Sequence, residues 1–290
     1  MKRNKIVIAI FVLLITSAVT YIIWNGVYDD AAFAASRDSK DYRDTKDIEF
    51  NDYRLIEINN EEDAREVITI YADRHGIDED EYPDYMVERM AANPDIRDFV
   101  LDYPNHTDED EEVRIAEISI REDIERADGI PEFYQWDPRW GYRTYGSDLM
   151  GFTGCGPTCL SMVAVYLLGN DYMTPAWVAQ FSMDNGYYDY ENCSGTFWTL
   201  MSSGAEQLGL YSEEVTGEVW DIEEHLANGE PIIAIMGPGD FTSEGHFIVL
   251  VSCEDGYLRV IDPYSSERTA RLWDIDEVLP QIQGMWAYSV

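Results

Sequence analysis

A glycine-rich turn followed by an apolar helix constrains the fold of this 290-residue chain more than any other feature. Residues 154–158 read Gly-Cys-Gly-Pro-Thr, and the apolar run 159–168 that follows is ended by Gly169. Proline in the first turn and glycine after the last are typical boundaries of a helix. The pattern therefore predicts a buried helix that begins at or just before Cys155.

Cys155 lies where a helix N-terminus activates a thiol. The unpaired backbone N–H groups and the dipole of the first turn favour a thiolate over a thiol. The flanking Gly154 and Gly156 leave the sulfur approachable and let the backbone N–H of Cys155 face a developing oxyanion. Cys155 is thus a candidate nucleophile, although a lone cysteine beside a helix is more often a small buried hydrophobic residue.

The composition changes at Ile130-Pro131. Residues 130–290 hold most of the tryptophans and all four cysteines, Cys155, Cys159, Cys193 and Cys253. With 46% hydrophobic and 13% aromatic residues, the chain can bury enough surface to offset the loss of conformational entropy. We therefore expect one compact domain at 130–290, within the usual size of about 100–200 residues.

Acidic side chains dominate the composition. The chain has 57 Asp and Glu against 20 Lys and Arg, a formal net charge of -37. Binding of nucleic acid needs clustered basic side chains, so no nucleic-acid partner is expected. The same charge favours cationic or neutral substrates. Neither a Cys-x-x-Cys pair nor a calcium-loop pattern occurs, and we expect no metal and no other cofactor.

The N-terminus has the pattern of a membrane anchor. Lys2, Arg3 and Lys5 precede residues 6–24, an uncharged run whose length as a helix, about 28 Å, is close to the thickness of a bilayer core. Basic residues before the run and acidic residues after it orient the bulk of the chain outward. We predict a transmembrane signal anchor at 1–28 and an extracellular C-terminal domain. A cleaved signal peptide, which would release the chain, is the alternative.

Three further segments separate this anchor from the compact domain. We expect a polar stalk at 29–58, a small helical pre-domain at 59–104 and an acidic linker at 105–129. Asn59 or Asn60 can cap the first helix of the pre-domain.

An apolar run after His246 and a second strand before Asp262 predict a β-hairpin. If its turn centres on Glu254, His246 lies opposite Asp262, and the carboxylate can orient the imidazole as a catalytic triad requires. If Asp255 and Gly256 form the tip, the pairing shifts by three residues. The sequence leaves the register open.

Gln135 is a polar amide among aromatic residues, upstream of Cys155. Its side-chain N–H can complete an oxyanion hole with the backbone N–H of Cys155.

These motifs together resemble one family. The resemblance rests on Gln135-Trp136-Asp137, Gly154-Cys155-Gly156-Pro157-Thr158, Gly195-Thr196, Gly245-His246-Phe247-Ile248-Val249-Leu250 and Asp262-Pro263. They are similar to the peptidase family C thirty-nine-like domain, a relative of the bacteriocin-processing, double-glycine-leader cysteine peptidases. The resemblance covers residues 130–290. It implies an α+β, papain-like cysteine peptidase fold in which the nucleophile helix packs on an antiparallel sheet, preceded here by the transmembrane helix and the small helical region.

The resemblance also implies the roles of the site residues. Cys155 would be the nucleophile, His246 the general base and acid, Asp262 the orienting residue and Gln135 the oxyanion donor. Thr196 would line the substrate cleft, or else cap a helix. Gln135 lies farther from Cys155 than in the leader peptidases, so leader cleavage is not carried over. No phosphate-loop motif occurs, and no fused transporter is expected.

The sequence thus predicts an exported, membrane-anchored cysteine peptidase, a thiol hydrolase of peptide or amide bonds, whose partners are a peptide or protein substrate and the membrane. An acyl transferase would use the same groups. The alternative from another class is a catalytically inactive papain-like module that binds peptides or cell-wall material. The pre-domain could also occlude the cleft like a pro-segment, in which case residues 131–290 alone would be more active.

Overall fold

The computed structural model describes residues 52–106, 115–191 and 195–290. Asp52–Val290 form one compact unit. Its centre is a six-stranded antiparallel sheet with the strand order β3-β8-β4-β5-β6-β7. The strands are β3 (Tyr211–Glu214), β4 (Ile232–Met236), β5 (His246–Glu254), β6 (Tyr257–Ile261), β7 (Leu272–Asp274) and β8 (Ile282–Ser289).

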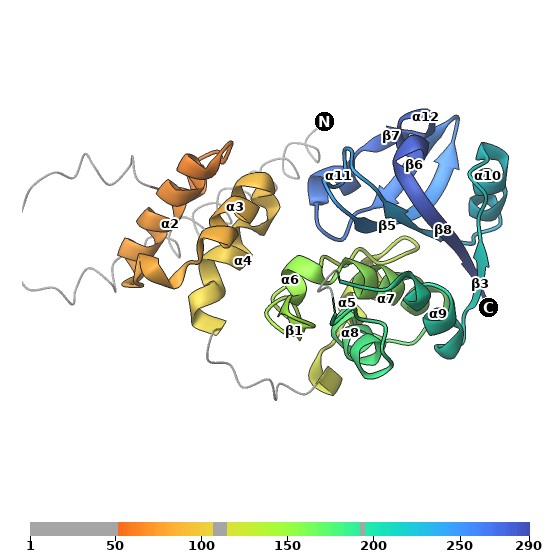
Figure 1. Cartoon of the computed structure of the whole chain (residues 1–290), viewed down its shortest axis with the longest axis horizontal. Coiled ribbons are helices and arrows are strands. Elements are labelled where there is room, and N and C mark those ends of the chain that lie inside the picture. The colour runs from red at the N-terminus through yellow and green to blue at the C-terminus, as the bar shows by residue number, and fades with distance from the viewer. Residues whose placement is uncertain (1–51, 107–114, 192–194) are drawn as a thin grey trace, which may run out of the picture. The chain divides into compact units, whose positions relative to one another are not determined.

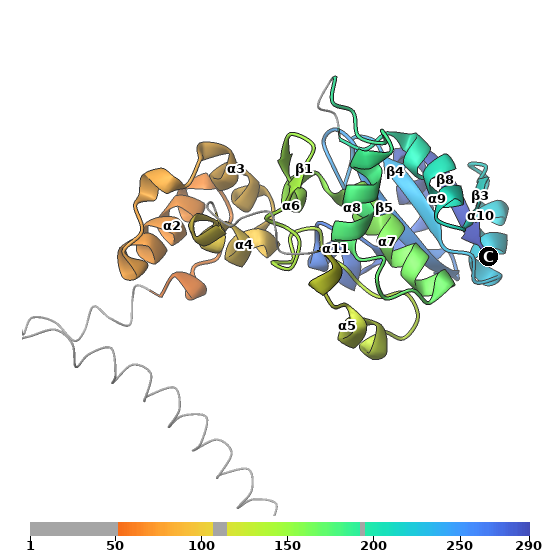
Figure 2. The same ribbon diagram turned by 90° about the horizontal axis from the view of Figure 1, so that it is seen from below.

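Both faces of this sheet are buried. Ile233 and Ile235 of β4 pack into one core with α7 (Cys155–Leu168) and α8 (Pro175–Asp184). Ile232 and Ala234, which alternate with them, pack into a second core with α10 (Val219–Ala227) and α12 (Ile275–Val278). In Figure 1 the helices α7 to α9 lie below the sheet, and Figure 2 shows α7 beside β5. All five residues of β4 are therefore apolar and buried.

Helix α7 begins at Cys155, and Gly169 ends it in the left-handed region with φ 67°. Residues 156–165 are all buried, including the polar Thr158 and Ser161. A helix this apolar can only lie inside the domain, between the sheet and a second helix layer. The predicted helix and its boundaries agree with the structure.

The hairpin of β5 and β6 turns at Asp255 and Gly256, both with positive φ (51° and 81°). This is the backbone that a two-residue hairpin turn requires. Pairing starts with Glu254 opposite Tyr257, and an irregularity between Leu250 and Ser252 then shifts the register by one residue. The structure thus selects the turn at Asp255-Gly256, and His246 does not lie directly opposite Asp262.

A helical unit, defined here as residues 52–106, precedes this domain. Asn60 caps its first long helix by accepting the backbone N–H groups of Glu62 and Asp63. A small core holds the unit together, with Val67, Met86 and Phe99 at its centre. The unit comprises η1 (Tyr53–Leu55), α2 (Glu61–His75), η2 (Glu79–Glu81), α3 (Asp84–Ala92), η3 (Pro94–Ile96), α4 (Arg97–Asp102) and η4 (Tyr103–His106).

Short elements connect these parts. They are η5 (Ile115–Glu117), α5 (Arg121–Arg126), β1 (Thr144–Tyr145), β2 (Asp148–Leu149), α6 (Met150–Thr153), η6 (Trp198–Leu200), α9 (Ser203–Gln207), α11 (Ser266–Ala270) and η7 (Leu279–Gln281). Two of them bear on the site, because α6 leads into Cys155 and α11 follows Asp262.

The fold prediction needs one correction. Its papain-like α+β part fits the structure, but the transmembrane helix is not supported: none of the helices in the described ranges is long and apolar enough to cross a membrane. The anchor was expected at 1–28 and the stalk at 29–58, so the anchor and most of the stalk lie outside the described residues.

Candidate active site

Cys155 is the first residue of α7, and the residue as a whole is partly exposed. Burial opposes ionisation of the thiol, but the hydrogen bond and the charge of His246 outweigh it and lower the pKa of Cys155 below its ordinary value. Backbone N–H groups of Phe247 and Gly156 act in the same direction. The thiol is therefore held in surroundings that favour the thiolate.

His246 is the first residue of β5 and is buried. Its Nε2 lies 2.7 Å from Oδ1 of Asp262. Nδ1 is then the ring nitrogen available to the Cys155 thiol. Burial opposes protonation, yet the carboxylate of Asp262 dominates and, together with Cys155, raises the pKa of His246 to about 10.

Asp262 is fully buried, and both of its carboxylate oxygens are occupied. Besides His246, Oδ1 accepts the backbone N–H groups of Tyr264 at 2.8 Å and Ser265 at 3.2 Å. Oδ2 accepts Nε of Arg268 at 2.5 Å. Burial raises the pKa of this carboxyl, but His246 and Arg268 overcome that effect and hold the pKa below its ordinary value. Asp262 is thus a fixed anion in the domain interior.

His246 interacts with Asp262 through a short contact and with Cys155 electrostatically. The lowered pKa of Cys155 and the raised pKa of His246 both favour a thiolate beside an imidazolium over the neutral pair. Such a pair presents a charged nucleophile and a proton donor within one hydrogen bond.

Gln135 is held between the segments that carry Cys155 and Asp262. Its backbone N–H donates to Pro263 O at 2.8 Å, and its Nε2 donates to Gly151 O of α6 at 3.0 Å. The side chain is 1% exposed, and its Oε1 has no hydrogen-bond partner among the described residues. Within those residues Gln135 makes no hydrogen bond to Cys155. One of the two amide hydrogens remains for a ligand, since a carboxamide nitrogen carries two.

The other described cysteines lie in different surroundings. Cys159, one turn after Cys155, is buried with its thiol donating to Phe247 O at 3.3 Å, and burial raises the pKa of Cys159 well above its ordinary value. Burial also raises the pKa of the partly exposed Cys253. Both are free thiols, and Cys193 lies outside the described residues. Among the three described cysteines, only Cys155 has a lowered pKa.

Thr196 packs against the nucleophile segment. A Cβ on Gly156 would lie 2.6 Å from Thr196 Oγ1, so only glycine leaves room for this contact. Thr196 Oγ1 is also 2.8 Å from the hydroxyl of the buried Tyr145. The following 3-10 helix begins after Phe197, so Thr196 is not its cap. Thr196 therefore packs against Gly156, the residue that follows Cys155.

Sequence reasoning missed several residues of this site. Arg268 and Thr269 follow Asp262 by six and seven residues, on the short helix α11, and both contact it. A charged residue near an aspartate is common, so this pairing left no recognisable signal. Asn93 and Asp95 of the helical unit bind the chain next to Asp262 from about 170 positions away. Only the tertiary fold brings them there.

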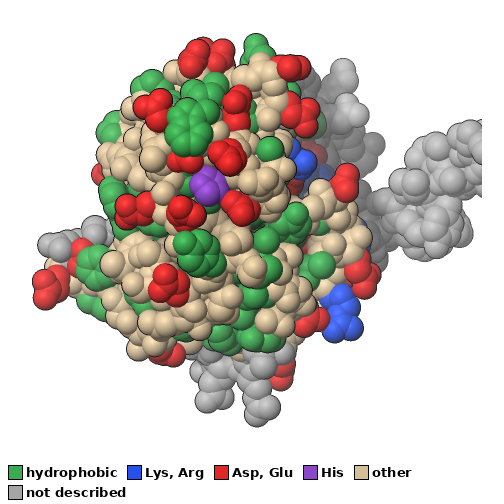
Figure 3. Space-filling view, turned by 90° about the vertical axis from the view of Figure 1, so that its right-hand side faces the viewer, with side chains coloured by type: hydrophobic (Ala, Val, Ile, Leu, Met, Phe, Trp, Pro, Cys, Tyr) green, Lys and Arg blue, Asp and Glu red, His purple; other side chains and the backbone are tan. Residues whose placement is uncertain are grey.

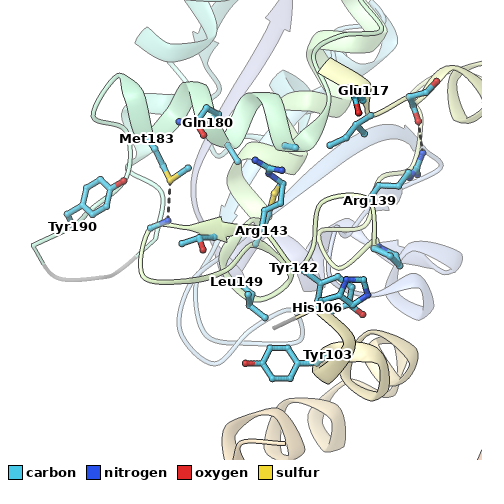
Figure 4. Close-up of a pocket in the computed structure, with 18 residues that line it drawn as sticks. Tyr103, His106, Glu117, Arg139, Tyr142, Arg143, Leu149, Gln180, Met183 and Tyr190 are labelled. Atoms are coloured by element: carbon cyan, nitrogen blue, oxygen red, sulfur yellow. Dashed lines mark hydrogen bonds between the residues drawn. The ribbon is translucent and has the colours of Figure 1, made fainter. Parts of the chain in front are cut away.

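A pocket of about 1020 Å³ lies apart from these residues (Figure 4). Tyr103 and His106 line it together with Arg139 and Gln180, and His106 stacks on Tyr142 with ring centroids 3.8 Å apart. Cys155, His246 and Asp262 are not among its lining residues. It is therefore separate from the candidate active site.

The surface chemistry agrees with the composition. Acidic side chains are scattered over the face in Figure 3, where basic ones are few. Among the described residues, no group of three or more His, Cys, Asp and Glu side chains is arranged to hold a metal ion.

A helix-borne cysteine beside a strand-borne histidine is the arrangement of the papain-like cysteine peptidases. A model of the Peptidase_C39 like family matches residues 128–289, more than half of the chain, and the chain belongs to this family. No curated protein matches the chain.

Solved structures similar to the chain include the following two. The peptidase domain of Streptococcus ComA, a bi-functional ABC transporter involved in a quorum sensing pathway, is 18% identical with a TM-score of 0.37, and the match covers 47% of this chain and 91% of that one. A putative C39-like peptidase from Bacillus anthracis is 14% identical with a TM-score of 0.35, and the match covers 48% of this chain and 90% of that one.

Proposed function

We propose that this protein is a cysteine peptidase, a thiol hydrolase of peptide or amide bonds, in which Cys155, His246 and Asp262 act as a triad. The observation that carries the proposal is the place of His246 between two partners: its Nε2 lies 2.7 Å from Oδ1 of Asp262, and its charge lowers the pKa of Cys155. Cys155 and Asp262 lie on either side of His246, and the negative charge of each stabilises its imidazolium. A histidine whose pKa is shifted by specific charged partners is typical of a functional site rather than of a purely structural one.

The first step of the reaction is acylation. The Cys155 thiolate attacks the carbonyl carbon of the substrate, forming a C–S bond and a tetrahedral oxyanion. The backbone N–H of Cys155 and Nε2 of Gln135 stabilise this oxyanion, and Gln135 is kept in place by its bond to Gly151. The imidazolium of His246 then protonates the leaving amine, the C–N bond breaks, and the acyl group stays on sulfur.

The second step releases the acyl group. His246, now neutral, takes a proton from water as the water attacks the thioester carbonyl. The C–S bond breaks, the acid product leaves, and the proton returns the site to its thiolate–imidazolium state. Throughout, Asp262 holds the ring orientation and stays ionised, because Arg268 and two backbone N–H groups bind it as well. An amine in place of water would give acyl transfer with the same residues.

The test compares cysteines within one chain. Iodoacetamide is expected to label Cys155 much faster than Cys253 near neutral pH, as read by mass spectrometry. Cleavage of a mixed peptide library should be lost in Cys155→Ala and kept in the control Cys253→Ala. Labelling of Cys155 no faster than that of Cys253 would contradict the proposal. In that case peptide binding that survives Cys155→Ala would identify an inactive binding module instead.

Substrate charge can be tested in the same assay. With a formal net charge of -37, the chain should attract cationic peptides, and added salt should slow their cleavage more than that of neutral peptides. Equal salt effects on both would exclude this steering.

A further inference from the structure

Asp95, in the helical unit, holds the start of helix α11. Its Oδ2 accepts the backbone N–H of Ser266 at 2.6 Å and that of Glu267 at 3.3 Å, and the hydroxyl of Ser265 at 3.2 Å. The first N–H groups of a helix have no partner within the helix, so a carboxylate placed there fixes both its position and its direction. Asp95 thus holds the first turn of this five-residue helix.

Helix α11 in turn carries two side chains that bind Asp262. Arg268 Nε donates to Oδ2 of its carboxylate, and the Thr269 hydroxyl accepts its backbone N–H at 3.0 Å. Both contacts depend on where α11 begins. Movement of α11 would remove a positive partner from Asp262 and loosen the carboxylate that faces His246.

Asn93 holds the other half of the same loop. Its Nδ2 donates to Tyr264 O at 2.5 Å, and Nε1 of Trp136 donates to the same oxygen at 3.0 Å. The N–H of Tyr264 binds Oδ1 of Asp262, and the Tyr264 ring lies edge-on to His246 with centroids 6.4 Å apart. Asn93 is 5% exposed, so its bond is not weakened by competition with water.

The helical unit also packs against the segment before the nucleophile. Phe152 of α6, three residues before Cys155, belongs to the core of the helical unit. Its ring meets Phe99 and Tyr85 edge-on, and the guanidinium of Arg89 lies 4.4 Å from the ring centroid. The helical unit therefore contacts the chain close to Cys155 and also close to Asp262.

We infer that the helical unit is a built-in positioning element of the active site, and that Asp95 and Asn93 are positioning residues that act on Asp262 through residues 264–269. The inference rests on the proposed function, since it concerns the same triad. This role is the opposite of that of an occluding pro-segment. Loosening the helical unit would weaken the site, because the unit supports residues 264–269, which hold Asp262.

The test is the pH profile of iodoacetamide labelling of Cys155 in the full chain. Asp95→Ala removes the acceptor, and the profile should move toward higher pH, with labelling at pH 7 falling about threefold or more. Asp95→Asn keeps an oxygen acceptor and should restore most of the wild-type profile. The matched control is Asp63→Ala, which removes an acceptor of the Asn59 N–H elsewhere in the helical unit and should leave the profile unchanged.

A second variant covers the case in which Asp95→Ala does not fold. Asn93→Asp keeps the side-chain oxygen that caps η3 but loses the donor to Tyr264, so it should shift the profile in the same direction. A folded Asp95→Ala or Asn93→Asp with the wild-type profile would overturn the inference. A wild-type Cys155 that labels no faster than Cys253 would instead overturn the proposed function, so the two failures are distinguishable.

Discussion

Asp262 binds His246 Nε2 with one carboxylate oxygen, at 2.7 Å, while its other oxygen accepts Arg268 Nε at 2.5 Å. The carboxylate is fully buried, so these two cations are its charged partners in a region of low dielectric. The arrangement keeps the carboxylate ionised and, through His246, favours ionisation of the Cys155 thiol. Five predictions follow from this relationship and from the packing around it.

Activity should have a broad pH window. The pKa of Cys155 is lowered, so the thiolate is present above a midpoint that lies below that of an ordinary thiol. The pKa of His246 is raised to about 10, so the imidazolium is present below that pH and lost above it. The pH dependence of kcat/KM should therefore rise on the Cys155 limb and fall near pH 10. A descending limb near pH 6.5 would show that Asp262 does not stabilise the imidazolium.

Asp262→Asn should lower both activity and stability. The neutral amide no longer favours the imidazolium, so the pKa of His246 falls, that of Cys155 rises, and kcat/KM at pH 7 drops about tenfold or more. Breaking a buried ion pair costs about 3–5 kcal/mol, and less here because Arg268 is 22% exposed. Urea unfolding measures this loss. Asp84→Asn, at a carboxylate that is 82% exposed and pairs with Arg65, is the control and should cost much less.

The same variant has a characteristic acid dependence. The folded pKa of Asp262 is below its ordinary value, so its stabilising effect is complete above the ordinary carboxyl pKa of about 4 and is lost as pH falls through the folded value. The stability difference between the wild type and Asp262→Asn should therefore shrink below about pH 4. A difference that stays constant down to pH 2 would contradict the charged state assigned to Asp262.

Gln135→Ala should slow turnover without changing the reactivity of the thiol. Loss of one oxyanion donor costs about 2.7–4 kcal/mol of transition-state stabilisation, or about 100- to 1000-fold in kcat. Alkylation by iodoacetamide develops no oxyanion, so the labelling rate of Cys155 should remain near the wild-type rate. A parallel loss in both assays would mean that Gln135 acts by holding Gly151 and α6 rather than as an oxyanion donor.

Gly156→Ala should disturb the packing of Thr196 against the residue that follows the nucleophile. The new methyl group would lie 2.6 Å from Thr196 Oγ1 and 2.9 Å from its Cβ, so Thr196 has to move. Overpacking costs about 1–3 kcal/mol, against a gain in helix propensity of about 1 kcal/mol. The Gly156→Ala/Thr196→Gly double variant should recover part of the loss in urea unfolding. Gly217→Ala, in open space at ordinary φ, is the control and should be close to neutral.

Local patterns in the sequence were sufficient for the elements that carry the candidate residues. Glycine and proline at its two ends predict the start and the end of α7, because these residues act on the backbone within one turn. The apolar runs around a Gly-containing turn likewise predict the β5–β6 hairpin. The resemblance to the family, drawn from the same short motifs, agrees with the family match over residues 128–289. The expected export and cellular location stay predictions.

The sequence alone did not determine the register of the β5–β6 hairpin. The turn at Asp255-Gly256 pairs Val249 with Ile261, and continuing this pairing puts Asp262 opposite Ile248. His246 is two residues farther along the strand, so it reaches Asp262 as a diagonal neighbour rather than a direct one. A one-residue irregularity near Val251 decides this geometry, and nothing in the local sequence predicts such a shift.

By itself, then, the sequence determined which segments become the buried helix and the hairpin, and it offered Cys155, His246, Asp262 and Gln135 as candidates, because periodicity and turn chemistry act over a few residues. Only the tertiary structure decided what surrounds Asp262. Arg268 reaches it from a short helix, and Asp95 holds that helix from a position 171 residues before Ser266. Charge stabilisation in a protein interior depends on distances between groups remote in sequence, and those distances exist only after the two cores and the helical unit have packed together.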